Sequence, residues 1–138
     1  MTIDRLPPAE KFGDFAVIRI PATPKSLNQL GQRGGWRPVH HEKKRWQGII
    51  EKYLLMCKLP RPLPRFLRVS AVMQFPTKHI RDAGNFKGPL EKALGDALVN
   101  GGWLVDDNPQ WWEFKEFDFG AVRGPNTTII TLDYGRID

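Results

Sequence analysis

The order of hydrophobic and polar positions along the chain predicts four β-strands. Each segment is either dense in β-branched and aromatic residues or alternates apolar and polar side chains with a period of two, as a strand with one covered face does. The four segments are residues 15–20, 67–75, 112–119 and 127–132. In the third segment the apolar phase shifts between Phe114 and Phe117, which indicates a β-bulge there.

Two further segments have the 3.6-residue periodicity of amphipathic helices. Between His41 and Lys58 the apolar side chains fall on one continuous helical stripe. The stripe consists of Trp46, Ile49, Ile50, Tyr53, Leu54 and Cys57. A second, shorter helix is expected from Pro89 to Asn100, because Pro is favoured as the first helical residue and the Gly-Gly pair that follows is typical of a helix end.

The resulting order of elements, β-α-β-α-β-β, predicts an α+β domain with a small mixed four-stranded sheet and two helices. Residues 1–14 are rich in Pro and charge and are expected to be a flexible lead-in, so the single domain spans residues 15–138. The longest apolar run, Tyr53–Cys57, is far shorter than the ~20 residues that cross a membrane, so we expect a cytoplasmic protein without a membrane partner. The lone Cys57 excludes a disulfide within the chain and is expected to be a core residue.

Charge changes sign along the chain. The formal net charge is +6 at pH 7, but residues 33–81 contain 12 Lys and Arg against two acidic residues, whereas residues 82–118 contain eight acidic residues against three basic ones. A basic segment favours a polyanion as partner, and an acidic segment beside it could hold a divalent metal ion. The alternative is that the charges segregate by chance in a short chain. A small-molecule enzyme with a carboxylate site is a third interpretation, but it has no use for the basic segment.

Two clusters of acidic residues follow a predicted strand or helix, in loops where side chains are accessible. Asp82 lies after a strand and beside Arg81, whose charge favours the ionised carboxylate that a metal ligand must be. Asp106 and Asp107 follow the second helix, and adjacent side chains in an extended segment point to opposite sides, so one of them is expected to face the site. The structural alternatives are that Asp82 caps a turn and that the Asp-Asp-Asn-Pro segment is an acidic surface turn.

Lys92 and Asp96 lie one turn apart on the second predicted helix. In the functional interpretation, the lysine points toward the carboxylates and stabilises negative charge that develops on a scissile phosphate. In the structural interpretation, the two side chains form an i,i+4 ion pair on the helix surface.

Three tryptophans, Trp103, Trp111 and Trp112, flank the pair of aspartates. They are expected to pack in the core or in a dimer interface. In the functional alternative, one of them stacks on unpaired bases.

Taken in order, these clusters resemble the signature region of the RusA-like Holliday junction endonucleases. The matching run is Arg81-Asp82-x-x-Asn85, Lys92-x-x-x-Asp96-Ala97-Leu98 and Gly102-Trp103-Leu104-x-Asp106-Asp107. The family pattern has Arg-Asp-x-Asp-Asn, a lysine just inside the next helix, Asp-Ala-Leu, and a closing Asp-Asp after a Gly-aromatic-Leu turn. The loop at residues 22–28 and the basic first helix also fit the family, so the resemblance covers nearly all of residues 15–132.

The resemblance implies a Mg²⁺-dependent endonuclease of a phage-type variant, with Mn²⁺ as a substitute metal, that acts as a homodimer. It would cut four-way or branched double-stranded DNA during recombination or repair. By position, the first metal aspartate of the family falls on Asp82, its catalytic lysine on Lys92, and its last aspartate on Asp107 with Asp106 adjacent. The side chains expected to bind DNA phosphates are Lys43, Lys44, Arg45 and Arg81.

The chain departs from the family pattern at two points. Gly84 stands where the family has its second aspartate, and extra residues separate Asn85 from Lys92. Asn85 could supply the missing metal ligand, and so could Asp96, which lies one turn beyond Lys92 on the same helix face. If neither does, the alternative function is a non-catalytic protein that binds branched DNA on the same fold, with its site impaired by Gly84.

Overall fold

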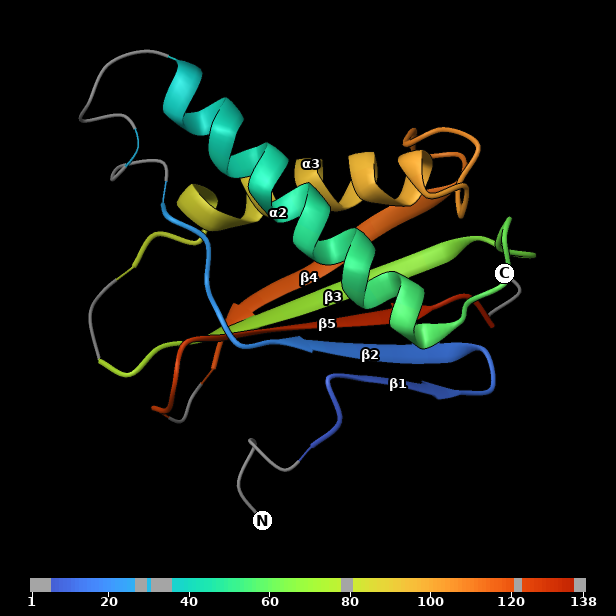
Figure 1. Ribbon diagram of the computed structural model, residues 1–138, viewed down its shortest axis with the longest axis horizontal. Helices are drawn as coiled ribbons and strands as arrows, with labels where there is room; N and C mark the ends of the chain where they lie inside the picture. The colour runs from blue at the N-terminus through green and yellow to red at the C-terminus, as the bar shows by residue number, and fades with distance from the viewer. Residues whose placement is uncertain (1–5, 27–29, 31–35, 78–80, 121–122, 136–138) are drawn as a thin grey trace.

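The computed structural model describes residues 6–26, 30, 36–77, 81–120 and 123–135 of the chain. Its elements, in chain order, are β1 (Ala9–Phe12), β2 (Phe15–Ile20), α2 (Trp36–Cys57), β3 (Leu67–Gln74), α3 (Gly84–Asn100), β4 (Trp112–Phe119) and β5 (Thr127–Asp133). The strands form one sheet in the order β1-β2-β5-β3-β4 (Figure 1). β3 and β4 run parallel, and the other neighbouring strands are antiparallel. The predicted class, a small α+β domain with a mixed sheet and two helices, is therefore confirmed.

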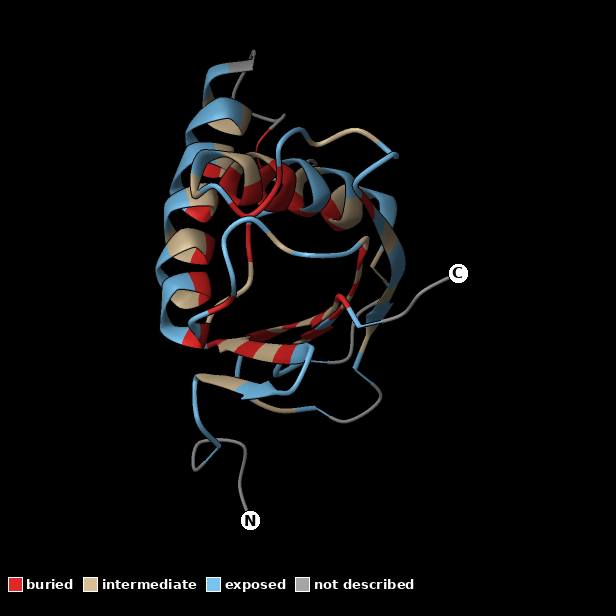
Figure 2. Ribbon diagram, turned by 90° about the vertical axis from the view of Figure 1, so that its right-hand side faces the viewer, coloured by how far each residue is buried: buried red, intermediate tan, exposed pale blue. Residues whose placement is uncertain are grey.

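Both helices cover the same face of the sheet, as Figure 2 shows. Alternate strand residues point into the space between the helices and the sheet, so Ile18, Val69 and Ile130 are fully buried. Leu54 from α2 and Leu94 from α3 are fully buried against them. The core thus lies between one face of the sheet and the paired helices, and it holds α3 rigidly beside α2.

The predicted four-stranded sheet is wrong, because the described part of the chain contains five paired strands. The additional strand, β1, comes from the segment expected to be a flexible lead-in. It pairs antiparallel with β2 through a tight turn in which Gly13 takes a left-handed φ of 60°. The backbone N–H and the guanidinium of Arg19 also donate to the carbonyls of Pro8 and Pro7, at 2.8 and 2.9 Å. A four-residue strand with Glu and Lys in its middle is too short and too polar for its periodicity to be recognised.

Both helices begin before their predicted first residues. α2 starts at Trp36 instead of His41, and α3 starts at Gly84 instead of Pro89. Pro89 therefore lies inside α3. The start of α3 is stabilised by Asp82, whose Oδ1 accepts a hydrogen bond from the Gly84 N–H at 2.9 Å. The loop at residues 22–28 lies partly outside the described residues.

The apolar stripe predicted for the first helix is confirmed in α2. Ile50 and Leu54 are fully buried, Trp46 is 1% exposed, and Cys57 is 4% exposed as a core residue. Burial raises the pKa of the Cys57 thiol to about 11. In the described part of the chain, no helix is both long and apolar enough to cross a membrane.

The predicted bulge in β4 is also confirmed. Val69 of β3 pairs with Phe114, but the next residue, Ser70, pairs with Glu116, so Lys115 is the extra residue. The bulge restores the inward phase of the strand, because aromatic residues on both sides of it pack against the core. The start of β4 and the loop before it lie alongside α3, where Trp112 and Asp107 approach Gly95.

Candidate functional site

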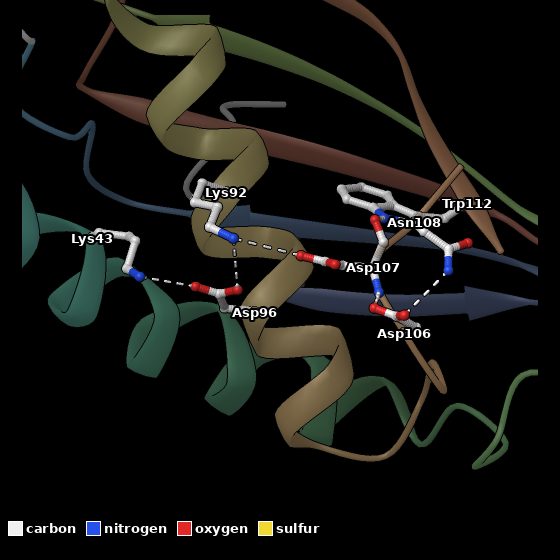
Figure 3. A network of polar contacts seen from close by, with 7 residues as sticks. All are labelled: Lys43, Lys92, Asp96, Asp106, Asp107, Asn108 and Trp112. Atoms are coloured by element: carbon white, nitrogen blue, oxygen red, sulfur yellow. Dashed lines mark hydrogen bonds and ion pairs between the residues drawn. The ribbon is translucent and has the colours of Figure 1, made fainter. Parts of the chain in front are cut away.

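Four charged side chains of alternating sign form a network across α2, α3 and the loop between α3 and β4 (Figure 3). Lys43 Nζ in α2 lies 3.0 Å from Asp96 Oδ2 in α3. Lys92 Nζ lies 3.5 Å from Asp96 Oδ1 and 3.7 Å from Asp107 Oδ2 in the loop. The ammonium of Lys92 therefore lies between carboxylates from two different elements.

Exposure differs among the members of this network. The side chains of Lys43 and Asp96 are 21% and 24% exposed, that of Asp107 is 36% exposed, and that of Lys92 is 60% exposed. Ion pairs of such accessible side chains contribute little to stability, so Lys92 can exchange its carboxylate partners for another anion at small cost. The predicted i,i+4 pair of Lys92 and Asp96 is present, and the contact with Asp107 extends it beyond a simple surface pair.

The adjacent Asp106 and Asp107 have different roles. Asp106 Oδ1 accepts a hydrogen bond from the Asp107 backbone N–H at 2.7 Å, and its Oδ2 accepts one from Asn108 Nδ2 at 3.2 Å. Asp106 is thus a turn residue, as the structural alternative proposed. Asp107 is the member of the pair that faces α3, where its Oδ2 contacts Lys92.

Asp82 lies apart from this network, at the beginning of α3. Its side chain accepts a hydrogen bond from the Gly84 N–H, and its carbonyl accepts one from the Asn85 N–H at 3.1 Å, so Asp82 forms a turn just before the N-cap residue Ala83, as the structural alternative proposed. Ten residues of the chain separate Asp82 from Lys92, or about 15 Å along a helix axis at 1.5 Å per residue. The structure therefore brings Asp96 and Asp107 together around Lys92 and leaves Asp82 at the helix end.

The predicted metal ligands do not form a ready-made cage. Within the described ranges, no group of three or more His, Cys, Asp or Glu side chains is arranged to hold a metal ion. Asp96 and Asp107, which share the Lys92 ammonium, are the predicted ligands that come closest to such an arrangement.

The basic side chains predicted to bind DNA lie in different environments. Lys43 points toward α3 and pairs with Asp96, and Arg45 pairs with Glu42. Arg81 donates to the carbonyl and the hydroxyl of Thr77, both at 3.1 Å, and stacks on the ring of Phe75. Lys44 is exposed. Arg37, Lys44 and Lys52 are all exposed and recur at helical spacing, so they form an outward basic face of α2.

The flanking tryptophans are mostly structural. Trp103 and Trp112 are 2% and 5% exposed and belong to the core, as expected from the packing interpretation. The Trp112 Nε1–H donates to the Asp107 carbonyl at 2.8 Å. Trp111 is 38% exposed and is the member of the trio whose ring is accessible.

Glu42 is a buried carboxylate that the sequence analysis did not single out. It is 8% exposed, and its oxygens accept hydrogen bonds from the Lys25 backbone N–H at 2.7 Å and from the Arg45 guanidinium at 2.8 and 3.0 Å. Burial acts to raise the pKa of Glu42, but these hydrogen bonds and the charge of Arg45 outweigh it and lower the pKa below its ordinary value. The i,i+3 spacing of Glu42 and Arg45 was the available signal in the sequence. Glu42 thus ties the loop before α2 to the helix.

We expect Glu42→Gln to lower the free energy of unfolding at pH 7 by about 1–3 kcal/mol, because Gln keeps the shape but loses the charge-assisted hydrogen bonds. The pKa is lower in the folded protein, so the stabilisation is complete above the ordinary value of 4.5 and is lost as the pH falls through the folded pKa. Urea unfolding at pH 7 and at several values below 4.5 measures this. A difference between the two proteins that stays constant over that range would contradict the assignment.

Comparisons with known proteins do not identify a family. No protein-family model matches the chain, and no curated protein matches it.

Proposed function

We propose that the chain is a metal-dependent, structure-selective endonuclease of RusA-like, phage-type fold that cuts four-way or branched DNA in recombination or repair. The observation that supports the proposal is the position of Lys92 between Asp96 and Asp107, beside a helix whose outer face is basic. An exposed ammonium next to two carboxylates is an arrangement suited to phosphate chemistry, because the carboxylates would hold a divalent cation and the lysine would contact a phosphate.

The donor chemistry of the site fits Mg²⁺ or Mn²⁺. Both cations prefer carboxylate and water oxygens, and Mg²⁺ is often held by only one or two carboxylates with several retained waters. Asp107 and Asp96 are the residues that would hold it. When bound, such an ion supplies an acidified water and neutralises charge on the leaving oxygen. Lys92, the most exposed member of the network, would stabilise negative charge on the scissile phosphate.

The outward face of α2 is the surface proposed to bind DNA. Arg37, Lys44 and Lys52 are exposed there and would contact backbone phosphates without reading the base sequence. Lys43 connects this helix to the site through Asp96. A homodimer would present two such sites to a junction that itself has two-fold symmetry, which would allow paired cuts.

A second candidate function is a non-catalytic protein that binds branched DNA. The observation that favours it is at the start of α3, where the Asp82 carboxylate is engaged in a turn with the Gly84 N–H and Gly84 carries no side chain. Under this alternative the basic face of α2 has the same role, but no cleavage occurs with any metal.

Cleavage of a synthetic four-way junction, compared with a linear duplex of the same sequence, tests the proposal. We expect cuts in the junction with Mg²⁺ or Mn²⁺ and none with a chelator. Binding should weaken steeply with salt, because Lys and Arg release counterions from the phosphates. Binding that prefers the junction, without cleavage under either metal, would favour the second candidate. Equal binding of branched and linear DNA would overturn both.

The pair Asp96→Asn and Glu91→Gln tests the role of Asp96. Both residues lie on α3, but Glu91 is exposed, whereas Asp96 bridges Lys43 and Lys92. We expect Asp96→Asn to reduce the cleavage rate by about 100-fold, because a neutral amide neither binds the metal well nor orients the lysine, and Glu91→Gln to leave it unchanged. Single-turnover rates on the junction measure both, and equal rates would remove Asp96 from the site.

A further inference from the structure

Gly95 lies in the middle of α3, where glycine weakens a helix relative to alanine. A Cβ at this position would lie 3.1 Å from Trp112 Cζ2, which is tighter than most packed Cβ contacts, and 3.4 Å from Asp107 Cβ, which is an ordinary van der Waals distance. Gly88 in the same helix has nothing within 4 Å of the corresponding position. The close approach is therefore specific to Gly95, where the loop before β4 crosses the helix.

The indole of Trp112 fixes the backbone of that loop. Trp112 is the first residue of β4, pairs with Leu67 of β3, and is 5% exposed, so its ring is anchored in the core. A buried N–H requires an acceptor, and the Trp112 Nε1–H donates to the Asp107 carbonyl at 2.8 Å (Figure 3). The ring thus lies between the sheet and the loop and sets the position of the Asp107 main chain.

The Asp107 side chain also lies against the surface of Gly95. Asp107 Oδ2 lies 3.6 Å from where a Cβ of residue 95 would be, and 3.7 Å from Lys92 Nζ. Lys92 and Gly95 are three residues apart and so are neighbours on the helix surface. The Asp107 carboxylate thus lies on the helix surface at Gly95, beside the lysine.

We infer that Gly95 and Trp112 are positioning residues, which hold the Asp107 carboxylate against Lys92. Trp112 acts through the hydrogen bond to the main chain of Asp107, and Gly95 acts by leaving room for the Trp112 ring, which a Cβ at residue 95 would displace. The catalytic consequence of this inference rests on the proposed function. A displacement of Asp107 by a few tenths of an ångström changes a reaction rate only if Asp107 takes part in a reaction.

The test compares Gly95→Ala with Gly88→Ala on the four-way junction. We expect Gly95→Ala to lower kcat by about 10–100-fold with little change in KM, because the displaced carboxylate serves the chemical step and not the binding of DNA. Gly88→Ala should leave both constants unchanged, since its methyl group meets nothing. Equal kcat values for the two variants would overturn the inference and leave the proposed function standing.

Trp112→Phe is the second variant, because it keeps an aromatic ring in the core and removes only the N–H donor and part of the ring. We expect it also to lower kcat with KM retained. Wild-type kcat in a folded Trp112→Phe protein, shown by an unchanged near-ultraviolet circular dichroism signal from the other tryptophans, would overturn the role of the hydrogen bond.

A crystal structure of Gly95→Ala separates this inference from the proposed function. We expect the Asp107 carboxylate to move away from Lys92, and Mn²⁺ to bind more weakly to this variant than to the wild type in calorimetry without DNA. If the wild type cuts no DNA but the carboxylate moves as expected, the positioning role stands and the nuclease proposal fails. If the carboxylate stays within contact of Lys92, the positioning role fails whatever the activity.

Discussion

Asp107→Asn is expected to abolish cleavage of a four-way junction, with a loss of about 100-fold or more, while binding of the junction is retained. Asn has the shape of Asp but no charge, so it is a poor metal ligand and no longer forms an ion pair with Lys92. DNA binding should persist because the exposed basic residues lie on the outer face of α2, not in the loop before β4. Single-turnover cleavage with Mg²⁺ and gel-shift binding without metal measure the two effects separately.

Asp106→Asn is the matched control for this substitution. Asp106 is the neighbouring residue, and the substitution makes the same chemical change. Asp106 Oδ1 accepts a hydrogen bond from the Asp107 N–H, and the side-chain oxygen of Asn can accept the same hydrogen bond. The control should therefore cut at nearly the wild-type rate. Equal losses in both variants would mean that the turn, and not the Asp107 carboxylate, is what cleavage requires. Full activity of Asp107→Asn would remove Asp107 from the site and, with it, the proposed mechanism.

Local patterns were sufficient to predict most of the fold. The period of two in β3 and the apolar stripe of α2 persist in the structure because each has one face on a single core, and the phase shift in β4 is a bulge for the same reason. β1 could not be predicted from its own residues, since its pairing depends on the turn at Gly13 and on the neighbouring edge of β2. The start of α3 was misplaced because Pro89 was used as the first helical residue, whereas the helix begins at Gly84, directly after the turn at Asp82.

The site was predictable where it depends on helix periodicity and less so elsewhere. The one-turn spacing of Lys92 and Asp96 predicted their contact. The sequence could not decide which of Asp106 and Asp107 faces α3, because the turn conformation there goes with tertiary contacts, such as the hydrogen bond from the core residue Trp112 to the Asp107 carbonyl. A glycine inside a helix also does not by itself predict that a loop approaches the helix at that position.

The charge pattern was informative in part. The basic and acidic segments do come together, through pairs such as Lys43 with Asp96 and Arg68 with Glu113. Side chains predicted to bind phosphate can therefore have a protein partner instead, and a count of charges along the chain does not show which of them remain available on the surface.

The largest expected effect on stability comes from Leu54→Ala, with a loss of about 2–5 kcal/mol in the free energy of unfolding. Leu54 is fully buried in α2 within the core between the helices and the sheet, so the substitution removes apolar contacts and leaves a cavity. The neighbouring Leu55 is the same residue type on the same helix but is 52% exposed. Leu55→Ala should change the free energy of unfolding by no more than about 0.5 kcal/mol. Urea unfolding of both variants measures the difference.

This pair tests the phase of α2, on which the rest of the site depends. If α2 were rotated by one residue, Leu55 would be buried in place of Leu54. The same rotation would turn Lys43 away from Asp96 and would turn Lys44 toward Asp96. Comparable losses in the two variants would therefore contradict both the packing of α2 and the link between its basic face and Lys92. A loss confined to Leu54→Ala supports the phase in which Lys43 pairs with Asp96 while Lys44 remains exposed.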